Sequence, residues 1–576
     1  MKVWRFWWRC LVIATGCLAL AATMLATGCA GDDDDDSDDD DAADDDTDDD
    51  TSDDDLMDDD ADDDDTGGEF QVRWDYLLVD AEAPPANPET GDATPALLNK
   101  IPLFRFREDV GDAEPRPVKS IVFLVAGYTA GANQIRFIAE NLVRLTQGDI
   151  EVWVPDRRFH LLEDVVGSNA AEEAGDPYIA YDYYYNNLEV NGRTFGGYLN
   201  PNAEETAMMS EWGLEMQLKD YQTLMNLIPQ DRRSTNVFFG GHSRGVWFAQ
   251  AFAGWESEPG RVMGNDLAGV ILLDGAARRD ETYDEADYLG DIEKIRVGDL
   301  PRTTLFSFFS PDLYTFLEIF TMAASDDLAD TSDPTLGPDG HFPYLGPFQI
   351  LKPLMTRGHD VTLTNEAFVG LVADDEYGLM ENFHGHMGRL TGGQICHDFL
   401  GDYPCEDGAS YSWINYDEVE PHELMKAQSL IQNIYEGPSN NADPYYSYRL
   451  DIDLYVADLC DTLGTWRDTY FQLYSSQMDA PVYVMATALV AETGTMEEYR
   501  DQLPPVRGYE VPRTEVGYDV LYQTEWEHID GLQVEPEYNN FFTDLADWVT
   551  TWSDGEVQVP EFGTPWEDVA DQYPVF

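Results

Sequence analysis

Apolar positions in residues 70–275 follow two patterns that alternate along the chain. Apolar runs of strand length occur at 70–81, 101–109, 120–127, 150–156, 236–241 and 267–275. Apolar residues at helical spacing occupy 132–148, 211–228 and 243–255. The runs at 120–127 and 267–275 are apolar almost throughout, as is typical of parallel strands buried on both faces. The alternation predicts an α/β fold, with a mostly parallel sheet covered by helices on both faces.

The same pattern returns near the C-terminus. Strand-like runs start at 481 and 518, and a helical stretch covers 539–552. About 200 residues separate this part from the first. We therefore expect a core built from residues 69–275 and 480–576, with residues 276–479 inserted over the carboxyl edge of the sheet as a lid or cap.

A second, smaller insertion is expected at residues 175–201, which are rich in tyrosine. Aromatic side chains in such a stretch can pack in a core or line a substrate site. Packing is the commoner role, so the sequence favours it here.

Residues 1–28 are predicted to be an export signal. A basic start precedes an apolar segment at 10–26, which is too short and too closely followed by charge for a comfortable membrane span. Residues 25–29, Leu-Ala-Thr-Gly-Cys, resemble the bacterial lipobox, and this resemblance implies lipidation of Cys29. Ala30 in place of Asp then favours the outer membrane of a bacterial cell envelope. The alternative is a plain secretory signal with an incidental cysteine.

Residues 29–68 are predicted to form a solvated tether. Positions 32–65 hold 25 aspartates and no apolar face, so like charges repel and nothing can be buried. Calcium binding is the sharper hypothesis, but the segment lacks the glycine and terminal glutamate of an EF-hand loop. Weak, nonspecific association with cations is therefore expected.

The rest of the chain is strongly acidic as well. The full sequence carries a net charge of −80, which leaves about −58 for residues 66–576, where there are only six lysines. Such a surface repels nucleic acid and anionic membranes, so neither is an expected partner, and a lipid anchor would be the only membrane contact. One physical interpretation is that the protein works in high salt, which screens the repulsion.

The cysteine and histidine spacing predicts no metal site. In an exported protein, Cys396 and Cys405 are a possible short-loop disulfide, which would leave Cys460 unpaired, although pairings with Cys460 stay open. No CxxC or HExxH motif occurs, and His384 and His386 lack a third ligand at metal spacing.

The candidate nucleophile is Ser243, within Gly241-His242-Ser243-Arg244-Gly245. A strand-like run precedes this G-x-S-x-G motif and a helical one follows it. In a nucleophile elbow, glycines two before and two after the serine let the backbone pass close to its neighbours, and the hydroxyl is lifted into the site. The placement favours a nucleophile over a chance motif.

The other parts of such a site can be sought separately. An oxyanion hole needs two converging backbone amides, which would be those of Arg244 and Tyr128, the latter in the glycine-containing turn at 126–131. The general base should come late in the chain. Only His528 lies after the last strand and before the final helix, so we expect it to be the base.

Two carboxylates compete as the third member of the triad. Asp274 ends the strand at 267–275, on the carboxyl edge where active sites of such sheets lie. Glu492 follows the strand that starts at 481 but is slightly displaced from its end. Asp274 is favoured, because an acid that orients an imidazole must be rigid and partly buried.

The elbow at 241–245, the turn at 126–131 and His528 together resemble the α/β-hydrolase superfamily, over about 70–275 and 476–576. Residues 152–164 are also similar to a stretch in some bacterial members. The resemblance implies an eight-stranded sheet. Most members carry the acid after the seventh strand, where Glu492 lies, whereas lipases similar to the pancreatic type carry it after the sixth, at Asp274.

The expected activity is acyl transfer to water on small-molecule or lipid esters, by a carboxylesterase or lipase-like enzyme without a cofactor. Peptide or amide cleavage is the second expectation. An alternative from another class is a binding or structural lipoprotein that keeps the scaffold without catalysis.

Overall fold

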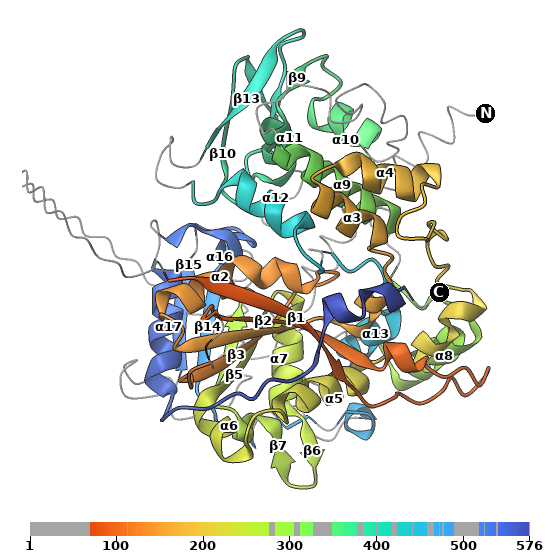
Figure 1. Ribbon diagram of the computed structural model, residues 1–576, viewed down its shortest axis with the longest axis vertical. Coiled ribbons are helices and arrows are strands. Elements are labelled where there is room, and N and C mark those ends of the chain that lie inside the picture. The colour runs from red at the N-terminus through yellow and green to blue at the C-terminus, as the bar shows by residue number, and fades with distance from the viewer. Residues whose placement is uncertain are drawn as a thin grey trace, which may run out of the picture.

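The computed structural model describes residues 70–574, except 112, 114, 276–282, 305–310, 327–347, 378–383, 399–400, 416–422, 440–441, 458–465, 472, 475–476, 489–517, 524 and 537–539. Figure 1 shows a central sheet flanked by helices, with a second group of helices and short strands gathered beyond one end of it.

The central sheet has the strand order β15-β14-β8-β5-β3-β4-β2-β1-β16. Its strands are β1 (Val72–Asp80), β2 (Lys100–Glu108), β3 (Ser120–Val125), β4 (Ile150–Pro155), β5 (Val237–His242), β8 (Gly269–Leu273), β14 (Val482–Thr487), β15 (Tyr518–Gln523) and β16 (Thr564–Pro565). β2 runs antiparallel to both of its neighbours and β16 runs antiparallel to β1, whereas all other pairs are parallel.

The predicted mostly parallel, eight-stranded sheet is therefore confirmed. The ninth strand, β16, adds two residues to the edge of β1. A strand this short has no readable period, so sequence reasoning missed it, but it pairs part of an edge that would otherwise stay open.

Helices cover both faces, as predicted. The main ones are α2 (Arg136–Leu145), α5 (Leu214–Met225), α6 (Gln230–Asn236), α7 (Arg244–Gly254) and α17 (Phe541–Trp552). The connection from β3 to β4 runs in one direction across the sheet, and those from β4 to β5 and from β5 to β8 run in the other. Because parallel crossovers are right-handed, the two directions place their helices on opposite faces. α2 packs with α17 on one face, and α7 packs with α5 on the other.

The main core is the apolar filling between these layers. β3, β5 and β8 are buried along their whole length. The ring of Phe239 on β5 stacks on Phe123 of β3 at 5.7 Å and also contacts Phe252 of α7 and Tyr221 of α5. This continuous packing gives the carboxyl ends of the strands a rigid base.

A second core lies beyond the sheet, within the second group of helices and short strands in Figure 1. It is built from α3 (Val166–Ala174), α4 (Pro177–Asn186), α9 (Pro311–Asp326), α11 (Asn365–Ala373), α12 (Ala427–Tyr435), β9 (Thr362–Leu363), β10 (Gly388–Thr391) and β13 (Ser410–Asn415). α10 (Phe348–Met355) precedes β9. Buried tyrosines of α4 pack in this core, namely Tyr181, Tyr183 and Tyr184, so the packing role favoured for the tyrosine-rich stretch applies to these three.

The described residues between β8 and β14 are divided between the two cores. α8 (Glu285–Val297) and α13 (Tyr448–Val456) contribute buried residues to the main core, while α9, α11 and α12 belong to the second. A lid role for 276–479 stays a prediction.

The remaining elements are β6 (Glu256–Glu258), β7 (Arg261–Val262), β11 (Ile395–Asp398), β12 (Gly401–Pro404), α16 (Asp530–Gln533) and 3-10 helices, of which η2 (Ala132–Ile135) and η3 (Arg158–Leu162) adjoin the site.

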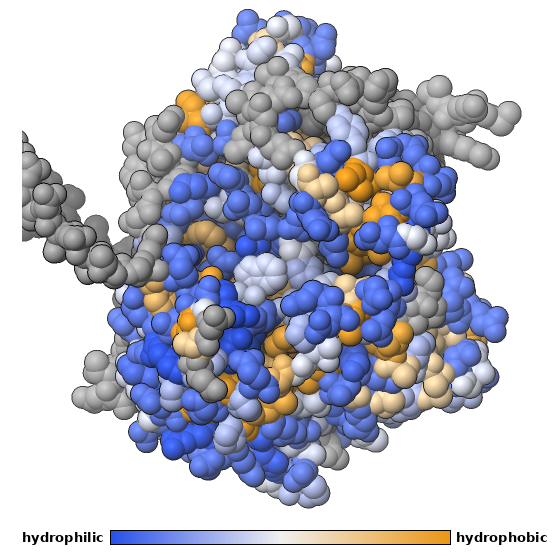
Figure 2. All heavy atoms as spheres, viewed as in Figure 1, coloured by the Kyte–Doolittle hydropathy of each residue, from blue (hydrophilic) through white to orange (hydrophobic). Residues whose placement is uncertain are grey.

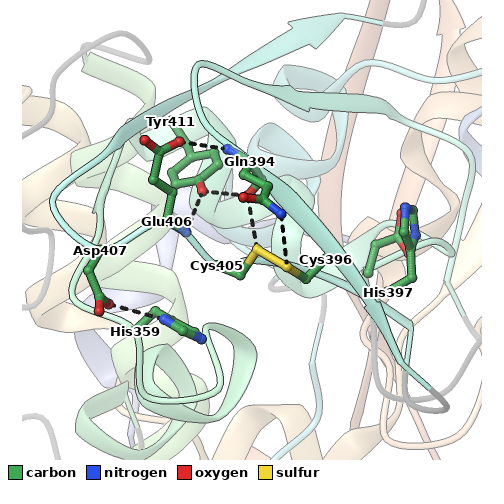
Figure 3. Close-up of a disulfide and its surroundings, with 9 residues drawn as sticks. His359, Gln394, Cys396, His397, Cys405, Glu406, Asp407 and Tyr411 are labelled. Carbon is green, nitrogen blue, oxygen red and sulfur yellow. Dashed lines mark hydrogen bonds and ion pairs between the residues drawn. A yellow bond between two sulfur atoms is a disulfide. The ribbon is translucent and has the colours of Figure 1, made fainter.

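Cys396 and Cys405 are joined by a disulfide that closes the β11–β12 hairpin (Figure 3). The Tyr411 hydroxyl donates to the carbonyl of Gln394 at 2.6 Å and ties the hairpin to β13. Cys460 lies outside the described residues.

The face seen in Figure 2 is covered mainly by hydrophilic side chains, with apolar ones in scattered patches. This agrees with the acidic composition. Among the described residues, no helix is both long enough and apolar enough to span a membrane.

Candidate active site

Ser243 occupies a sharp turn between β5 and α7. Its backbone has φ 54° and ψ −122°, in the left-handed half of the map, which costs a residue other than glycine about 1–3 kcal/mol. The surrounding structure holds this conformation, since the Ser243 amide donates to the carbonyl of Leu273 on β8 at 3.0 Å. The side chain is half-buried.

The two glycines of the motif are required by close backbone approach. A Cβ on Gly241 would lie 2.5 Å from the Gly245 carbonyl carbon, and a Cβ on Gly245 would lie 2.1 Å from the Val125 carbonyl oxygen. Both distances are far below van der Waals contact. Gly241 and Gly245 therefore let β5 turn into α7 against the end of β3.

The structure brings Asp274 and His528 together. Asp274 Oδ2 lies 2.5 Å from His528 Nδ1, and both side chains are buried. The other carboxylate oxygen, Oδ1, accepts from the Thr487 amide at 2.8 Å, so the aspartate is fixed on both sides. Asp274 itself follows β8 with φ 39°. A Cβ on the next residue, Gly275, would lie 2.2 Å from the Ser243 carbonyl oxygen, which places this turn against the elbow.

Glu492, the competing acid, lies outside the described residues. Within the described part of the chain, Asp274 is the carboxylate that contacts the His528 ring. Its position after the sixth strand of the sheet, in chain order of the eight long strands, is the one that the pancreatic-type pattern implied.

His242 supports His528 from the side of β5. Its Nε2–H donates to the His528 carbonyl oxygen at 2.9 Å, and the two rings lie 4.5 Å apart between centroids. Burial and the neighbouring charge of His528 lower the pKa of His242 to about 3. His242 is therefore neutral at physiological pH, and no second positive charge competes with one that develops on His528.

The turn at 126–131 lies directly against Ser243. A Cβ on Gly127 would be 3.2 Å from Ser243 Cβ and 3.6 Å from its Oγ. The Gly127 amide donates to Gln134 Oε1 at 2.8 Å, which directs the chain on toward Tyr128. The Arg244 amide is in the first turn of α7, where backbone N–H groups have no partner within the helix.

Arg157 anchors the same turn from behind. Its buried guanidinium donates to the carbonyls of Ala126 at 2.6 Å, Gly127 at 2.9 Å and Ala130 at 2.8 Å. Three bonds from one planar group fix the backbone of the turn, and with it the direction of the Tyr128 amide.

The side chains of the two candidate oxyanion residues are also in contact. The Arg244 guanidinium lies over the Tyr128 ring at 5.2 Å and over the Trp247 ring at 4.0 Å. It donates to Asp451 Oδ1 of α13 at 2.7 Å. The guanidinium is therefore held by the insertion, while the Arg244 amide belongs to the elbow.

A buried ion pair joins the His528 loop to the insertion. Asp530 Oδ2 lies 2.6 Å from His386 Nδ1, and Asp530 Oδ1 accepts from the His386 amide at 2.9 Å. Burial disfavours charge on His386, but the hydrogen bond and charge of Asp530 raise its pKa to about 10. His386 belongs to the His-Gly-His stretch that the sequence analysis considered as a metal motif. In the structure it is the charged partner of Asp530, which follows His528 by two residues.

Sequence reasoning missed His242, Arg157 and Asp530 as supporting residues. His242 was within the motif itself, and Arg157 lies in the stretch at 152–164 that contributed to the resemblance. Asp530 follows His528 by two residues, but its partner is 144 positions away in sequence. Only the fold could reveal that contact.

No model of a known protein family matches the sequence, and no curated protein matches it. Among solved structures, a candidate lipase from Sulfolobus solfataricus is 12% identical, with 82% of this chain and 98% of that chain covered and a TM-score of 0.39. A thermophilic esterase from Thermogutta terrifontis is 13% identical, with 83% and 99% covered and a TM-score of 0.30. A peroxisomal α/β-hydrolase from Saccharomyces cerevisiae is 10% identical, with 88% and 94% covered and a TM-score of 0.34.

At such low identities and TM-scores, neither the substrate nor the site residues of this chain follow from these structures. The fold rests on the chain's own topology. A mostly parallel sheet with an antiparallel second strand, and a strand-turn-helix elbow with a serine at positive φ, define an α/β-hydrolase fold.

Proposed function

We propose that the protein is an exported serine hydrolase that cleaves carboxylic esters. The observation that carries the proposal is the contact of 2.5 Å between Asp274 and His528 beside a serine at a strained elbow. Nδ1 of the imidazole is bound to the carboxylate, and in the proposed mechanism Nε2 is the nitrogen that acts on Ser243.

In the proposed mechanism, His528 Nε2 takes the proton of the Ser243 hydroxyl as its oxygen attacks the ester carbonyl. The Tyr128 and Arg244 amides donate to the oxyanion of the tetrahedral intermediate. His528 then protonates the leaving alcohol, and water, activated by the same nitrogen, releases the acid from the acyl-enzyme. Asp274 keeps the ring in the required tautomer and stabilises the imidazolium.

The cell-envelope part of the proposal rests on the sequence. Lipidation of Cys29 would anchor the chain in the outer membrane, and the aspartate-rich tether of residues 29–68 would hold the hydrolase away from the lipid surface. A Cys29→Ser variant expressed in a Gram-negative bacterium tests this. Release of the protein from the membrane fraction is expected, and equal retention of variant and wild type would contradict the anchor.

The activity is tested with short and long p-nitrophenyl esters. Ser243→Ala is expected to lower kcat by at least about 10³-fold, the loss typical of removing a triad member. The matched control is Ser234→Ala, an exposed serine of α6 that precedes β5 and so lies away from its carboxyl end. Equal rates for wild type and Ser243→Ala would refute the esterase.

A fluorophosphonate probe gives a readout that is independent of substrate choice. Labelling of the wild type and the Ser234→Ala variant, but not of Ser243→Ala, is expected. A folded wild type that is never labelled would favour the binding or structural lipoprotein. A labelled protein that cleaves amides faster than esters would favour the amidase.

A further inference from the structure

A cluster of buried ionisable side chains lies behind the turn at 126–131 and takes no part in the proposed hydrolysis. His160 of η3, Glu163 just after it, and Asp443 of the segment before α13 place a ligand atom each within 4.8 Å of one another. These residues are 4%, 7% and 1% exposed, so none of them is solvated from a surface.

The His160 ring is oriented as a metal ligand would be. Its Nε2–H donates to the carbonyl of Pro438 at 3.2 Å, which leaves Nδ1 as the nitrogen that would bind a metal after losing its proton. Nδ1 is buried without a hydrogen-bond partner and lies 3.4 Å from Glu163 Oε1. Histidines that bind metals usually donate their other N–H to a carbonyl or carboxylate in this way.

Asp443 presents a second buried atom without a hydrogen-bond partner. Its Oδ1 is buried without a hydrogen-bond partner, while Oδ2 faces the Arg157 guanidinium at 3.4 Å. Leaving a carboxylate oxygen buried and unpaired is costly, and Arg157 already shares its charge among three carbonyls. The geometry therefore leaves a place beside Oδ1 for a proton or for a metal ion.

A neighbouring carboxylate, Asp156, shows the contrast. Its Oδ2 accepts from the hydroxyls of Ser439 at 2.7 Å and Tyr76 at 3.0 Å, and its Oδ1 accepts from the Ala132 amide at 3.2 Å. Both of its oxygens are satisfied by neutral donors, so Asp156 adds negative charge to the cluster without needing a cation of its own.

We propose that His160, Glu163 and Asp443 bind a divalent transition-metal ion of the Zn²⁺ type. One imidazole nitrogen and two carboxylate oxygens form a three-ligand set for zinc, whereas Ca²⁺ and Mg²⁺ take oxygen ligands. Tetrahedral bonds of about 2.0–2.1 Å separate neighbouring ligand atoms by roughly 3.4 Å, and the His160–Glu163 atoms lie 3.4 Å apart.

A cavity borders the cluster on the side of Glu163. Glu163 also lines a cavity shared with Asp164, Tyr314 and Glu318. Water in this cavity would supply the fourth ligand of the proposed site.

The ion would lie one layer behind the proposed oxyanion turn. The Asp443 amide donates to the Thr129 carbonyl at 2.7 Å, and Asp443 faces Arg157, which holds three other carbonyls of the turn. The metal would thus fix the position of that turn and would not contact the substrate.

The test measures the metal content of the full chain after it is loaded with Zn²⁺ and dialysed against a weak chelator. The chelator removes Zn²⁺ that is bound weakly to the aspartate-rich tether. One Zn²⁺ per chain is expected in the wild type and none in His160→Gln. The matched control is His397→Gln, whose side chain is 76% exposed, and it should keep the ion. Substitution with Co²⁺ should give the intense d–d absorption of a tetrahedral site in the wild type and the control only.

A thermal readout keeps the inference testable if His160→Gln folds poorly. A strong chelator should lower the Tm of the wild type and of His397→Gln, and Zn²⁺ should restore it, whereas Asp443→Asn should not respond. A wild type that retains no metal, or a folded His160→Gln that retains as much as the wild type, would overturn the proposal. The first result would leave His160 as a protonated partner of the carboxylates. Neither result depends on ester hydrolysis.

Discussion

The imidazole of His242 donates from Nε2 to the carbonyl oxygen of His528 at 2.9 Å. The residue before the candidate nucleophile is thereby bonded to the backbone of the candidate base. Both histidines are buried, and their rings lie side by side. Movement of the His528 loop away from β5 would break this bond, so His242 is a positioning residue for the proposed reaction.

Replacing His242 with Phe should lower kcat by about 5- to 10-fold with little change in KM, because one hydrogen bond of about 1 kcal/mol no longer holds His528. His242→Gln keeps a donor and should recover part of the rate. Steady-state kinetics with a short p-nitrophenyl ester check both. A fall in kcat that is equal in the two variants would count against positioning through this bond.

The acid stability of the protein should depend on His242. Its folded-state pKa is about 3, below the value of about 6.5 in an unfolded chain. The unfolded state therefore takes up a proton as pH falls below about 6.5, while the folded state does not. The stabilisation by neutral His242 is complete above that pH and is lost progressively as pH falls toward 3.

Urea unfolding of the wild type and His242→Gln from pH 7 to pH 4 measures this loss. Carboxylates contribute to both proteins alike, so the difference in unfolding free energy isolates His242. The difference should shift in favour of the variant as pH falls. A difference that does not change with pH would contradict the lowered pKa.

The His386–Asp530 pair predicts the opposite pH dependence. The folded-state pKa of His386 is raised to about 10, so its charged form is favoured by folding. The stability that it contributes is fully present below about pH 6.5 and is lost as pH rises through about 10. The destabilisation caused by His386→Gln should therefore be large at pH 6 and small above pH 10, as measured by chemical unfolding.

The exposed pair of His359 and Asp407, 3.1 Å apart, provides the control for that experiment. It belongs to the region drawn in Figure 3, and His359→Gln should change stability by less than about 1 kcal/mol at either pH. An effect of His386→Gln that is the same at pH 6 and above pH 10 would show that the pair is not ionised as inferred.

Most of the sheet could be predicted from sequence because strands buried on both faces are continuous apolar runs, as in β3 and β8. Ser243 could be predicted because the elbow is local in sequence. Contacts between distant segments could not. The Arg157–Asp443 contact joins residues 286 positions apart, and nothing in the composition of either segment indicates the other. For the same reason, histidine spacing alone could not associate His160 with Asp443.

The elbow glycines predict a sharp difference between two alanine substitutions. Gly245→Ala would place a Cβ 2.1 Å from the Val125 carbonyl oxygen. The free energy of unfolding should therefore fall by at least about 1–3 kcal/mol, and fluorophosphonate labelling should be lost. Gly290→Ala in α8 meets no atom within 4 Å and should be neutral or stabilising by about 0.5–1 kcal/mol. Thermal unfolding compares them, and an equal Tm for the two would contradict the packing of the elbow against β3.

The acidity of the folded part predicts that salt stabilises it. Residues 66–576 carry about −58 charges, and their mutual repulsion favours the expanded chain at low ionic strength. The screening length falls from about 10 Å at 0.1 M salt to about 3 Å at 1 M, so the unfolding midpoint should rise over this range of NaCl. A chain that starts at residue 66 is the control, because it lacks the tether but keeps this charge. Its midpoint should rise equally, whereas a midpoint that stays flat from low to molar salt would refute salt adaptation of the hydrolase itself.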